Sequence, residues 1–200
     1  DLMASIYQTE ISPHTMPVHL GHLNYQPSKL EEAVDKWHHD TIPLDYVMMV
    51  SDPATLSGGG FEYFMGTKME AEELSKQGKT PPRDRVKAPK FPGPGYAVAL
   101  HGNMVVHRGA PLTKPGERIT MVNAYVSMDC LVDDQSRSRD LIGIDDPAAL
   151  YAEWAKHASW RTQNRLQQII DSMAFDQERD QVLDQLEFAA NDLLKMINDM

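Results

Sequence analysis

RITMVNAYV, residues 118–126, is the longest strand-like segment of the chain, and it sets the expected fold class. Shorter segments of strand character precede it at 45–50, 61–64, 96–100 and 103–107, with turns that contain glycine or proline among them. Several short strands at this spacing are typical of a β-barrel or a jelly roll. The sequence therefore predicts a β-rich centre.

Helical patterns flank the predicted strands on both sides. Asp146 followed by Pro147 is a favourable helix start, and the apolar residues after it keep to one face. A second helix is expected from about Asp176, so the chain would end in a helical pair. A shorter helical pattern lies around Leu30, Ala33 and Val34, where Ser28 would cap it.

Residues 66–92 interrupt the strand pattern with a polar, proline-containing stretch. We expect a long inserted loop with a helix near Glu70 to Gln77. Long loops inside compact domains are often lids over a functional site. Arg83, Arg85 and Lys87 in this loop are interpreted as solvated rather than as contacts to an anionic substrate.

Composition limits the classes of function. The chain has 200 residues with 42% hydrophobic content, which suits one barrel domain, residues 1–132, with a helical extension, residues 133–200. Its net charge of -10 disfavours nucleic acid and anionic membranes as partners. The single cysteine, Cys130, cannot form an internal disulfide and is expected to be a core residue.

Localisation follows from features that the sequence lacks. It has no apolar run of about 18 residues and no secretory signal pattern, so a cytoplasmic protein is expected. Because the chain begins Asp1-Leu2-Met3 without an initiator methionine, we expect either that upstream residues have been lost or that the chain is a fragment.

His38 and Asp40, separated by one residue, form the first part of a predicted metal site. In a strand, residues two apart project to the same face and can share one metal ion. His107 would supply a third ligand from a distant strand, and it is preferred to His101 because Val105-Val106 leads into it. Two imidazoles and one carboxylate suit non-haem iron, although zinc uses the same residue types.

Arg118 distinguishes between these metals, because it begins a predicted strand soon after His107. A guanidinium there offers a bidentate clamp for the carboxylate of a co-substrate. Thr120, two residues on and on the same face, would add a hydroxyl contact. Arg108, next to His107, is the candidate for binding a substrate carboxylate, and this assignment is an expectation only.

These pieces together resemble the Fe(II)/2-oxoglutarate-dependent dioxygenase superfamily. The resemblance rests on WHHD (37–40), SGGGFE (57–62), VVHRG (105–109) and RIT (118–120), and it covers slightly under half of the chain. The Trp-His-x-Asp motif of the chain is similar to both the phytanoyl-CoA-hydroxylase-like and the taurine-dioxygenase-like branches. The resemblance implies an α+β protein centred on a double-stranded β-helix, a jelly-roll or cupin-like barrel with flanking helices. It also implies that His38, Asp40 and His107 bind iron, and that Arg118 and Thr120 bind the far carboxylate of 2-oxoglutarate.

The activity implied by the resemblance is oxidation of an unactivated carbon of a small-molecule substrate by dioxygen, with release of succinate and carbon dioxide. Hydroxylation is the default outcome, and desaturation and ring closure stay open, as does the substrate. Two alternatives remain: a cupin-like metalloenzyme that does not use 2-oxoglutarate, and a non-catalytic binding module on the same barrel. For the C-terminal helices, a homodimer interface and a brace against the barrel are equally open.

Three further histidines, His14, His19 and His22, follow no recognised metal-binding spacing. With Asn24 and Tyr25 they are expected to line one side of the cavity or to lie on the surface. The sequence thus predicts one metal site rather than two.

Overall fold

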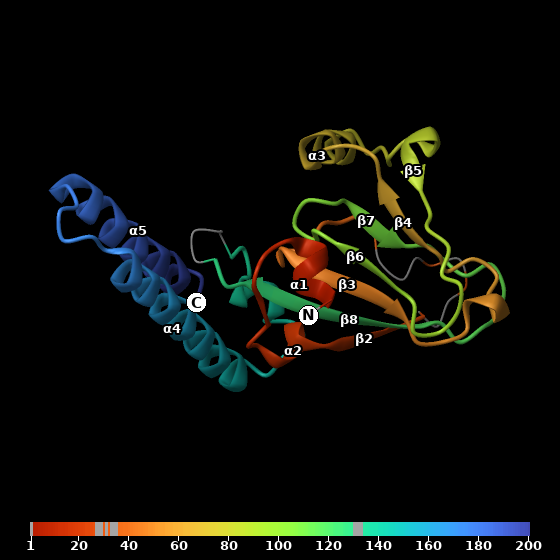
Figure 1. Ribbon diagram of the computed structural model, residues 1–200. Helices are drawn as coiled ribbons and strands as arrows, with labels where there is room; N and C mark the ends of the chain where they lie inside the picture. Colours follow the sequence, from red (N-terminus) through yellow and green to blue (C-terminus); the bar gives the residue numbers. More distant parts are fainter. Residues whose placement is uncertain (1, 27–29, 31, 33–35, 130–133) are drawn as a thin grey trace. The chain divides into compact units, whose positions relative to one another are not determined.

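The computed structural model describes residues 2–26, 30, 32, 36–129 and 134–200 (Figure 1). The chain divides into two compact units. One, the sheet unit, comprises His19–Val126, and the other, the helical unit, comprises Asp1–Val18 with Ser127–Met200. The division predicted from the sequence, at residue 132, stays a prediction.

Two antiparallel sheets make up the sheet unit. The first contains β2 (His22–Tyr25), β3 (Leu44–Met49), β6 (Ala97–Leu100) and β8 (Ile119–Ser127), in the order β2-β8-β3-β6. The second contains β4 (Phe61–Phe64), β5 (Val86–Lys87) and β7 (His107–Gly109), in the order β5-β4-β7. Neither sheet closes on itself among the described residues. With antiparallel sheets and C-terminal helices, the structure is mixed α/β and compatible with a cupin-like fold.

β8 is an interior strand of the first sheet, because it pairs with both β2 and β3, and one of its faces is buried. Thr120, Val122, Ala124 and Val126 are buried, while the residues between them are less so. Val122 lies opposite Val47 of β3 and shares a cluster with Phe61 of β4 and Leu100 of β6. Because this cluster takes side chains from both sheets, it forms the core of the sheet unit. Burial of each such side chain stabilises the fold by about 1.5–3 kcal/mol.

Most of the strands occur where the sequence predicts them, with one exception. The predicted strand 103–107 is wrong, because the chain turns at residues 102–104 and the strand begins only at His107. The amides of Met104 and Val105 both donate to the carbonyl of His101, at 2.9 Å each, which closes the turn. The apolar character of Val105 and Val106 reflects burial beside the core rather than a strand.

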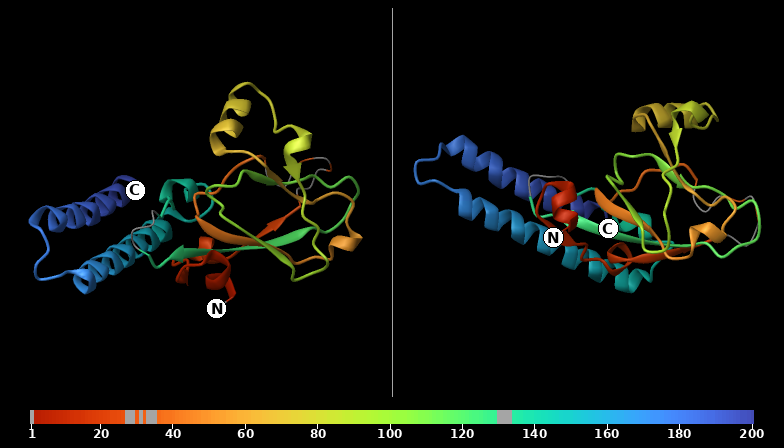
Figure 2. Two further views of the ribbon diagram at one scale, coloured as in Figure 1. Left: turned by 45° about the horizontal axis from the view of Figure 1, so that its top comes forward. Right: turned by 45° about the vertical axis from the view of Figure 1, so that its right-hand side comes forward.

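The insert at 66–92 contains the helix α3 (Lys68–Lys76), close to the predicted position. Thr67 and Glu70 form a capping box, in which each side chain accepts from the backbone amide of the other. The guanidinium of Arg85 then binds both carboxylate oxygens of Glu70, at 3.1 Å each. Figure 2 shows α3 standing apart from the two sheets, and none of its residues is buried.

The helical unit is built mainly from α4 (Pro147–Ser172) and α5 (Arg179–Asn198), the predicted C-terminal pair, which lie side by side (Figures 1 and 2). Asp146 caps α4 by accepting from the amide of Ala148 at 2.9 Å. The unit also contains α1 (Leu2–Tyr7), β1 (Ile11–Pro13) and the 3-10 helix η3 (Ser138–Leu141).

The smaller elements are the short helix α2 (Pro17–Leu20) and the 3-10 helices η1 (Pro53–Thr55) and η2 (Arg83–Arg85). No helix among the described residues is long and apolar enough to cross a membrane. The helix predicted around Leu30, Ala33 and Val34 and the core position predicted for Cys130 fall largely or wholly outside the described residues.

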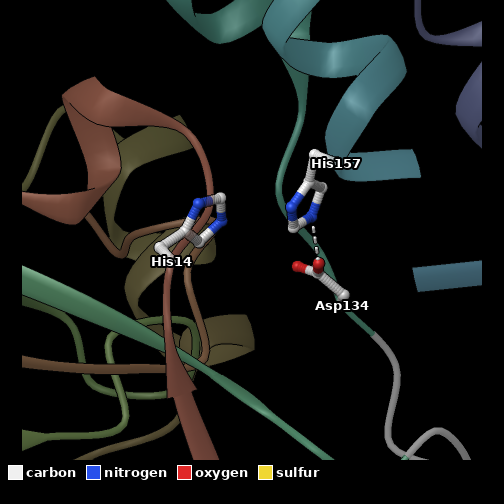
Figure 3. A group of neighbouring side chains, drawn as sticks. All are labelled: His14, Asp134 and His157. Carbon is white, nitrogen blue, oxygen red and sulfur yellow. Dashed lines mark hydrogen bonds and ion pairs between the residues drawn. The ribbon is translucent and has the colours of Figure 1, made fainter. Parts of the chain in front are cut away.

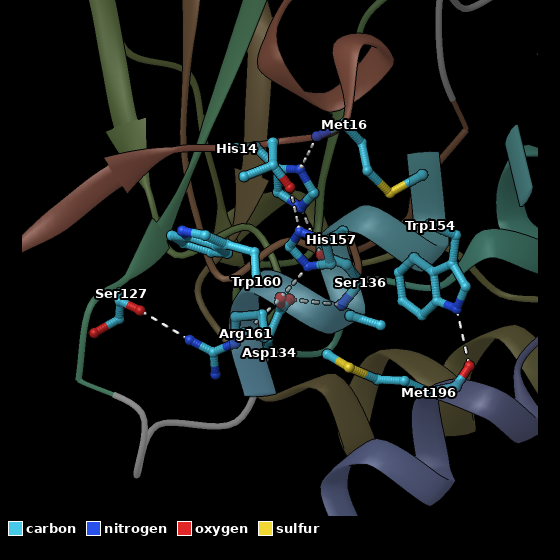
Figure 4. A network of polar contacts seen from close by, with 12 residues as sticks. His14, Met16, Ser127, Asp134, Ser136, Trp154, His157, Trp160, Arg161 and Met196 are labelled. Atoms are coloured by element: carbon cyan, nitrogen blue, oxygen red, sulfur yellow. Dashed lines mark hydrogen bonds and ion pairs between the residues drawn. The ribbon is translucent and has the colours of Figure 1, made fainter. Parts of the chain in front are cut away.

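A buried polar network lies within the helical unit (Figure 4). Nε2 of His157 on α4 is 2.6 Å from Oδ2 of Asp134, and the guanidinium of Arg161, one turn further on, is 3.8 Å from the same oxygen. Both side chains are almost fully buried. Burial alone would raise the pKa of Asp134, but the hydrogen bond from His157 and the charges of His157 and His14 outweigh it and hold that pKa below its usual range.

We expect Asp134→Ala to destabilise the protein by on the order of 3–5 kcal/mol, because it leaves Arg161 and His157 without their buried carboxylate. The matched control, Asp176→Ala, alters an exposed carboxylate and should stay within about 0.5 kcal/mol of the parent. Urea unfolding at neutral pH measures both values.

The pH dependence gives a second measure of the same interaction. A carboxylate with a lowered folded-state pKa stabilises the fold above its unfolded value of 3.8, and this stabilisation is lost as the pH falls through the folded value. The parent should therefore lose more stability between pH 5 and the acid limit of folding than Asp134→Ala does, and parallel curves would contradict this account.

Candidate metal centre

His38 and His107 are brought together by their own backbones. The amide of His38 donates to the carbonyl of His107 at 3.0 Å, and the amide of His107 donates to the carbonyl of His38 at 2.8 Å. This reciprocal pair forms an isolated antiparallel bridge beside β7. Residues paired in this way project their side chains to the same face, and the two ring centroids lie 4.5 Å apart.

Asp40 joins the two histidines from the same segment as His38. Its amide donates to the carbonyl of Gly102 at 2.9 Å, which fixes the backbone beside the turn after β6. Oδ1 of Asp40 is 3.4 Å from Nε2 of His38, and Oδ2 is 3.5 Å from Nε2 of His107. The structure therefore gathers all three predicted ligands into one group, which could hold a metal ion.

The hydrogen bonds of the ring nitrogens test whether this group fits a metal. Nδ1 of His38 lies 2.6 Å from the carbonyl of Lys36, and Nδ1 of His107 lies 2.9 Å from the carbonyl of Val105. Because a carbonyl only accepts, both Nδ1 atoms carry a proton, and both Nε2 atoms are directed toward Asp40. Metal-binding histidines are typically oriented in this way, so the residues fit a divalent cation.

One side of the group is open. The side chains of His38 and Asp40 are 38% and 27% exposed, whereas that of His107 is 6% exposed. A metal held by three protein ligands on a partly exposed site keeps positions for other molecules. The donor set suits non-haem iron, and zinc is compatible with it as well.

Asp45 is the residue that the sequence reasoning missed. It lies on β3 and is fully buried, and its carboxyl group lies beside that of Asp40, since Oδ2 of both residues approaches Gly102. Burial and the neighbouring charge of Asp40 raise the pKa of Asp45 well above its ordinary value. Burial alone would also raise the pKa of Asp40, but hydrogen bonds and charges from His38, His107 and Asp45 lower it. The raised pKa favours the neutral form of Asp45 beside the Asp40 carboxylate.

The only signal for Asp45 in the sequence is its position at the start of the buried strand 45–50. A charged residue there is unusual, since isolated carboxylates are rarely buried without a partner. Its partner, Asp40, is close in sequence but separated by a bend, so the contact itself could not be predicted.

Arg118, immediately before β8, and Thr120, within it, also lie together inside the sheet unit. Both are 2% exposed. Nε of Arg118 donates to the carbonyl of Gly59 at 2.5 Å, and Nη1 lies 3.4 Å from Oγ1 of Thr120. Gly59 has a φ of +72°, and a Cβ there would lie 2.9 Å from Cδ of Arg118. Glycine at this position therefore makes room for the guanidinium.

Arg108 has a different environment from the one predicted. Its Nε and Nη2 both lie 2.7 Å from Oε2 of Glu62, the residue opposite it in the β4–β7 pair. Its guanidinium also stacks on the ring of Trp37, 4.8 Å from the centroid. Since Glu62 balances its charge, Arg108 is a weaker candidate for holding a substrate carboxylate, and that role stays a prediction.

The other predicted positions can also be placed. His101 accepts the turn hydrogen bonds described above and does not belong to the metal group. Arg85 is not simply solvated, because it binds Glu70 and stacks on Phe64 at 4.7 Å. His19 is buried and His22 is partly exposed, and neither joins a metal-binding group among the described residues.

His14 belongs to a second His-Asp-His group, within the helical unit, together with Asp134 and His157 (Figure 3). The two rings stack with centroids 4.6 Å apart. The amide of Met16 donates to Nδ1 of His14, so Nε2 carries the proton and donates to Ser136 at 2.9 Å.

His157 in this second group is satisfied in the same way. It contacts Oγ1 of Thr15 through Nδ1 at 2.6 Å and Asp134 through Nε2. Every ring nitrogen of this group therefore has a partner in the protein. The group fits a structural hydrogen-bond network better than a metal site.

Comparisons with known proteins give distant similarities only. No protein-family model matches the chain, and no curated protein matches it. Among solved structures, a bsmA homolog from Methylobium petroleophilum PM1 is 19% identical with a TM-score of 0.32, over 46% of this chain and 33% of that one. The apo form of the non-heme monooxygenase ThoJ is 12% identical with a TM-score of 0.42, over 85% and 84%. HygX from Streptomyces hygroscopicus, with iron bound, is 17% identical with a TM-score of 0.37, over 63% of each chain.

The chain thus spans one third of the bsmA homolog and just under two thirds of HygX. Similarities of this size do not establish a family. The functional conclusion therefore depends on the geometry of the site.

Gly102 allows the two carboxyl groups to approach, and its replacement gives a test of the site. A Cβ at Gly102 would collide with Oδ2 of Asp45 and lie 2.8 Å from Oδ2 of Asp40. We expect Gly102→Ala to weaken binding of ferrous or nickel ions by roughly 10-fold to 100-fold, because it displaces a ligand and the carboxyl group beside it. Calorimetric titration measures the loss.

Gly93→Ala is the matched control, since a Cβ there meets nothing within 4 Å. It should bind metal like the parent. If folded Gly102→Ala also binds like the parent, Asp40 is not a ligand in the proposed position.

Proposed function

We propose that the sheet unit is a non-haem iron oxygenase that uses 2-oxoglutarate and dioxygen to oxidise, by default to hydroxylate, an unactivated carbon of a small molecule. Succinate and carbon dioxide would be the co-products. The single observation that supports the proposal is the directed convergence of His38, His107 and Asp40, with both Nδ1 atoms held by carbonyls. The iron-containing neighbour HygX and the non-heme monooxygenase ThoJ agree with it but are too distant to add weight.

His38, Asp40 and His107 would hold the iron. When bound, iron and 2-oxoglutarate supply the activation of dioxygen, which side chains alone cannot perform. The chain contributes the geometry: the bridge between His38 and His107 fixes two ligands, and Asp45, buried beside Asp40, would orient the third. His107, nearly fully buried, would form the closed side of the site, and His38 the side facing substrate.

Arg118 and Thr120 are proposed to bind the far carboxylate of 2-oxoglutarate. A buried guanidinium is costly unless an anion or several acceptors surround it. The carbonyl of Gly59 and the hydroxyl of Thr120 engage part of it, and a carboxylate would add a charge-assisted contact. This is the step that separates the proposal from a cupin-like metalloenzyme that does not use 2-oxoglutarate.

The proposed architecture is the double-stranded β-helix. The two antiparallel sheets share one core cluster, and the metal ligands lie at β7 and beside it. Such a barrel places a metal in a walled cavity from which water can be displaced.

Anaerobic addition of ferrous iron and 2-oxoglutarate should produce a visible charge-transfer band, and succinate should form when air is admitted. Arg118→Met should weaken 2-oxoglutarate binding at least tenfold while the iron affinity stays within about twofold, because a neutral side chain cannot clamp a carboxylate. Absorbance titration measures both affinities.

Two further variants show whether a loss of 2-oxoglutarate binding in Arg118→Met is specific or results from misfolding. Thr120→Val removes only the hydroxyl and should weaken 2-oxoglutarate binding severalfold. Arg83→Met, in the exposed η2, should change nothing. Iron binding without a band or succinate would instead identify a metalloenzyme of another kind, and folded protein that binds no iron would favour a non-catalytic module.

A further inference from the structure

The helical pair, α4 with α5, has one side that is engaged within the helical unit. Trp154 and Ala158 of α4 pack with Met196 of α5 in a buried cluster. One turn further along α4, Nη1 of Arg161 donates to the carbonyl of Ser127 at 2.9 Å (Figure 4). The buried residues of α4 therefore follow one side of the helix, and its other side is exposed.

A stripe of apolar residues follows an exposed side of α5. Its members recur every three or four residues and are Leu183, Leu186, Ala190, Leu193 and Ile197. This spacing is typical of a helix that packs on another helix. Leu183, Leu186 and Ile197 are nevertheless 38%, 46% and 52% exposed. The residues of α5 that are buried in the helical pair, Ala189 and Met196, belong to a different stripe. The helix α5 thus has two apolar sides, and only one of them is buried.

The exposed side of α4 has a matching stripe. Ser159, Thr162, Leu166 and Ile170 recur at the same spacing, and they line a groove of about 430 Å³ together with Leu193 of α5. The groove places both stripes on one face of the helical pair, which we call the apolar face. Leu166 and Ile170 are 41% and 66% exposed. Toward the start of α4 the stripe continues with three exposed alanines, Ala148, Ala152 and Ala155.

The apolar face has no charged residue. Between Lys156 and Asp171, the charged residues of α4 are Arg161 and Arg165, and both are buried. The charged residues of α5 all lie outside its exposed stripe and are Arg179, Asp180, Asp184, Glu187, Asp192 and Lys195. Depletion of charge is typical of the core of a protein interface. Two chains that each have a net charge of -10 repel one another, so an uncharged face is where two copies can meet.

A second copy also fits the face in area. At a rise of about 1.5 Å per residue, α5 is about 30 Å long, and two adjacent helices present a width of about 20 Å. Contact between two such faces would bury about 600 Å² on each chain, or about 1,200 Å² in total. This total reaches the lower end of the range for specific protein interfaces.

The apolar face is complementary to itself in shape. Leu166 and Ile170 are large and lie toward the end of α4, whereas the alanines of its stripe are small and lie toward its start. A two-fold axis across the middle of the helical pair would stack α4 on α4 of a second copy in the opposite direction. Large side chains would then meet small ones, as close packing requires. Ala190, in the middle of the α5 stripe, would lie near the axis.

We propose that a second copy of this chain docks on the apolar face, so that the two helical pairs form a four-helix bundle with two-fold symmetry. A lipid surface is the competing occupant of an exposed apolar face. Helices that lie on membranes are rich in lysine and arginine on their polar side, whereas α5 has four acidic residues and two basic ones. The charge of the pair therefore favours a second copy. This proposal does not depend on the metal chemistry proposed for the sheet unit.

Sedimentation equilibrium of the full chain tests the proposal. The parent should be a dimer at about 100 µM, because specific interfaces have dissociation constants in the micromolar range or below. Ala190→Glu should weaken association at least tenfold, since it would bury two carboxylates close together in an apolar contact. Leu186→Ala should also weaken association at least tenfold, because each copy loses buried apolar area.

Ala149→Glu is the matched control. It makes the same substitution at an exposed position of α4 that lies outside the apolar face, and it should associate within twofold of the parent. Far-ultraviolet circular dichroism shows whether each variant is folded. If Ala190→Glu does not fold, Leu186→Ala decides, since it removes an exposed side chain and adds no charge.

Three results would overturn the proposal. The first is a parent that stays monomeric at about 100 µM. The second is a dimer that folded Ala190→Glu and Leu186→Ala leave unchanged, and the third is an equal loss of association in Ala149→Glu. A monomeric parent that binds phosphatidylcholine vesicles, and loses this binding in Leu186→Ala, would identify a lipid surface as the occupant instead.

Discussion

The reciprocal backbone hydrogen bonds between His38 and His107 are the constraint on which the site depends. They join the segment of His38, which precedes β3, to β7 of the second sheet. They also place the two imidazoles on one face. Asp40 is then held by its own amide at Gly102, and Asp45 supports its carboxylate from β3. Three separate parts of the sheet unit therefore fix one small group of donor atoms, so the fold and the site are specified together.

The elements that the sequence predicted well are those with strong periodicity. The alternation of residues 118–126 gave a strand that the structure contains, and Asp146-Pro147 marked the start of α4. A strand was wrongly predicted at 103–107 because, over five positions, buried apolar residues give the same sequence pattern in a turn as in a strand. The ligands could be found from residue type and order. The proximity of Asp45 could not, because it depends on how the chain bends between Asp40 and β3.

Two groups of the same composition have different chemistry in this chain. In the helical unit, both nitrogens of each histidine are engaged: those of His14 by a backbone amide and a hydroxyl, and those of His157 by a hydroxyl and the Asp134 carboxylate, which also opposes Arg161. In the sheet unit, carbonyls engage the Nδ1 atoms, and both Nε2 atoms are directed at Asp40 at 3.4 and 3.5 Å. Neither arrangement is visible in the sequence, since the partners of His14 and His157 come from segments far apart. Ligand geometry, rather than the count of His and Asp, distinguishes the two groups.

The separateness of α3 has a consequence for how this protein could change over evolution. The helix buries none of its side chains, and its own capping box and one ion pair hold it. Substitutions on this helix therefore cost little folding stability and leave the ligand-bearing backbone untouched. Selection could alter its shape and charge repeatedly while the metal group stays constant. The insert is in this sense the adaptable part of the molecule, and related chains should diverge there first.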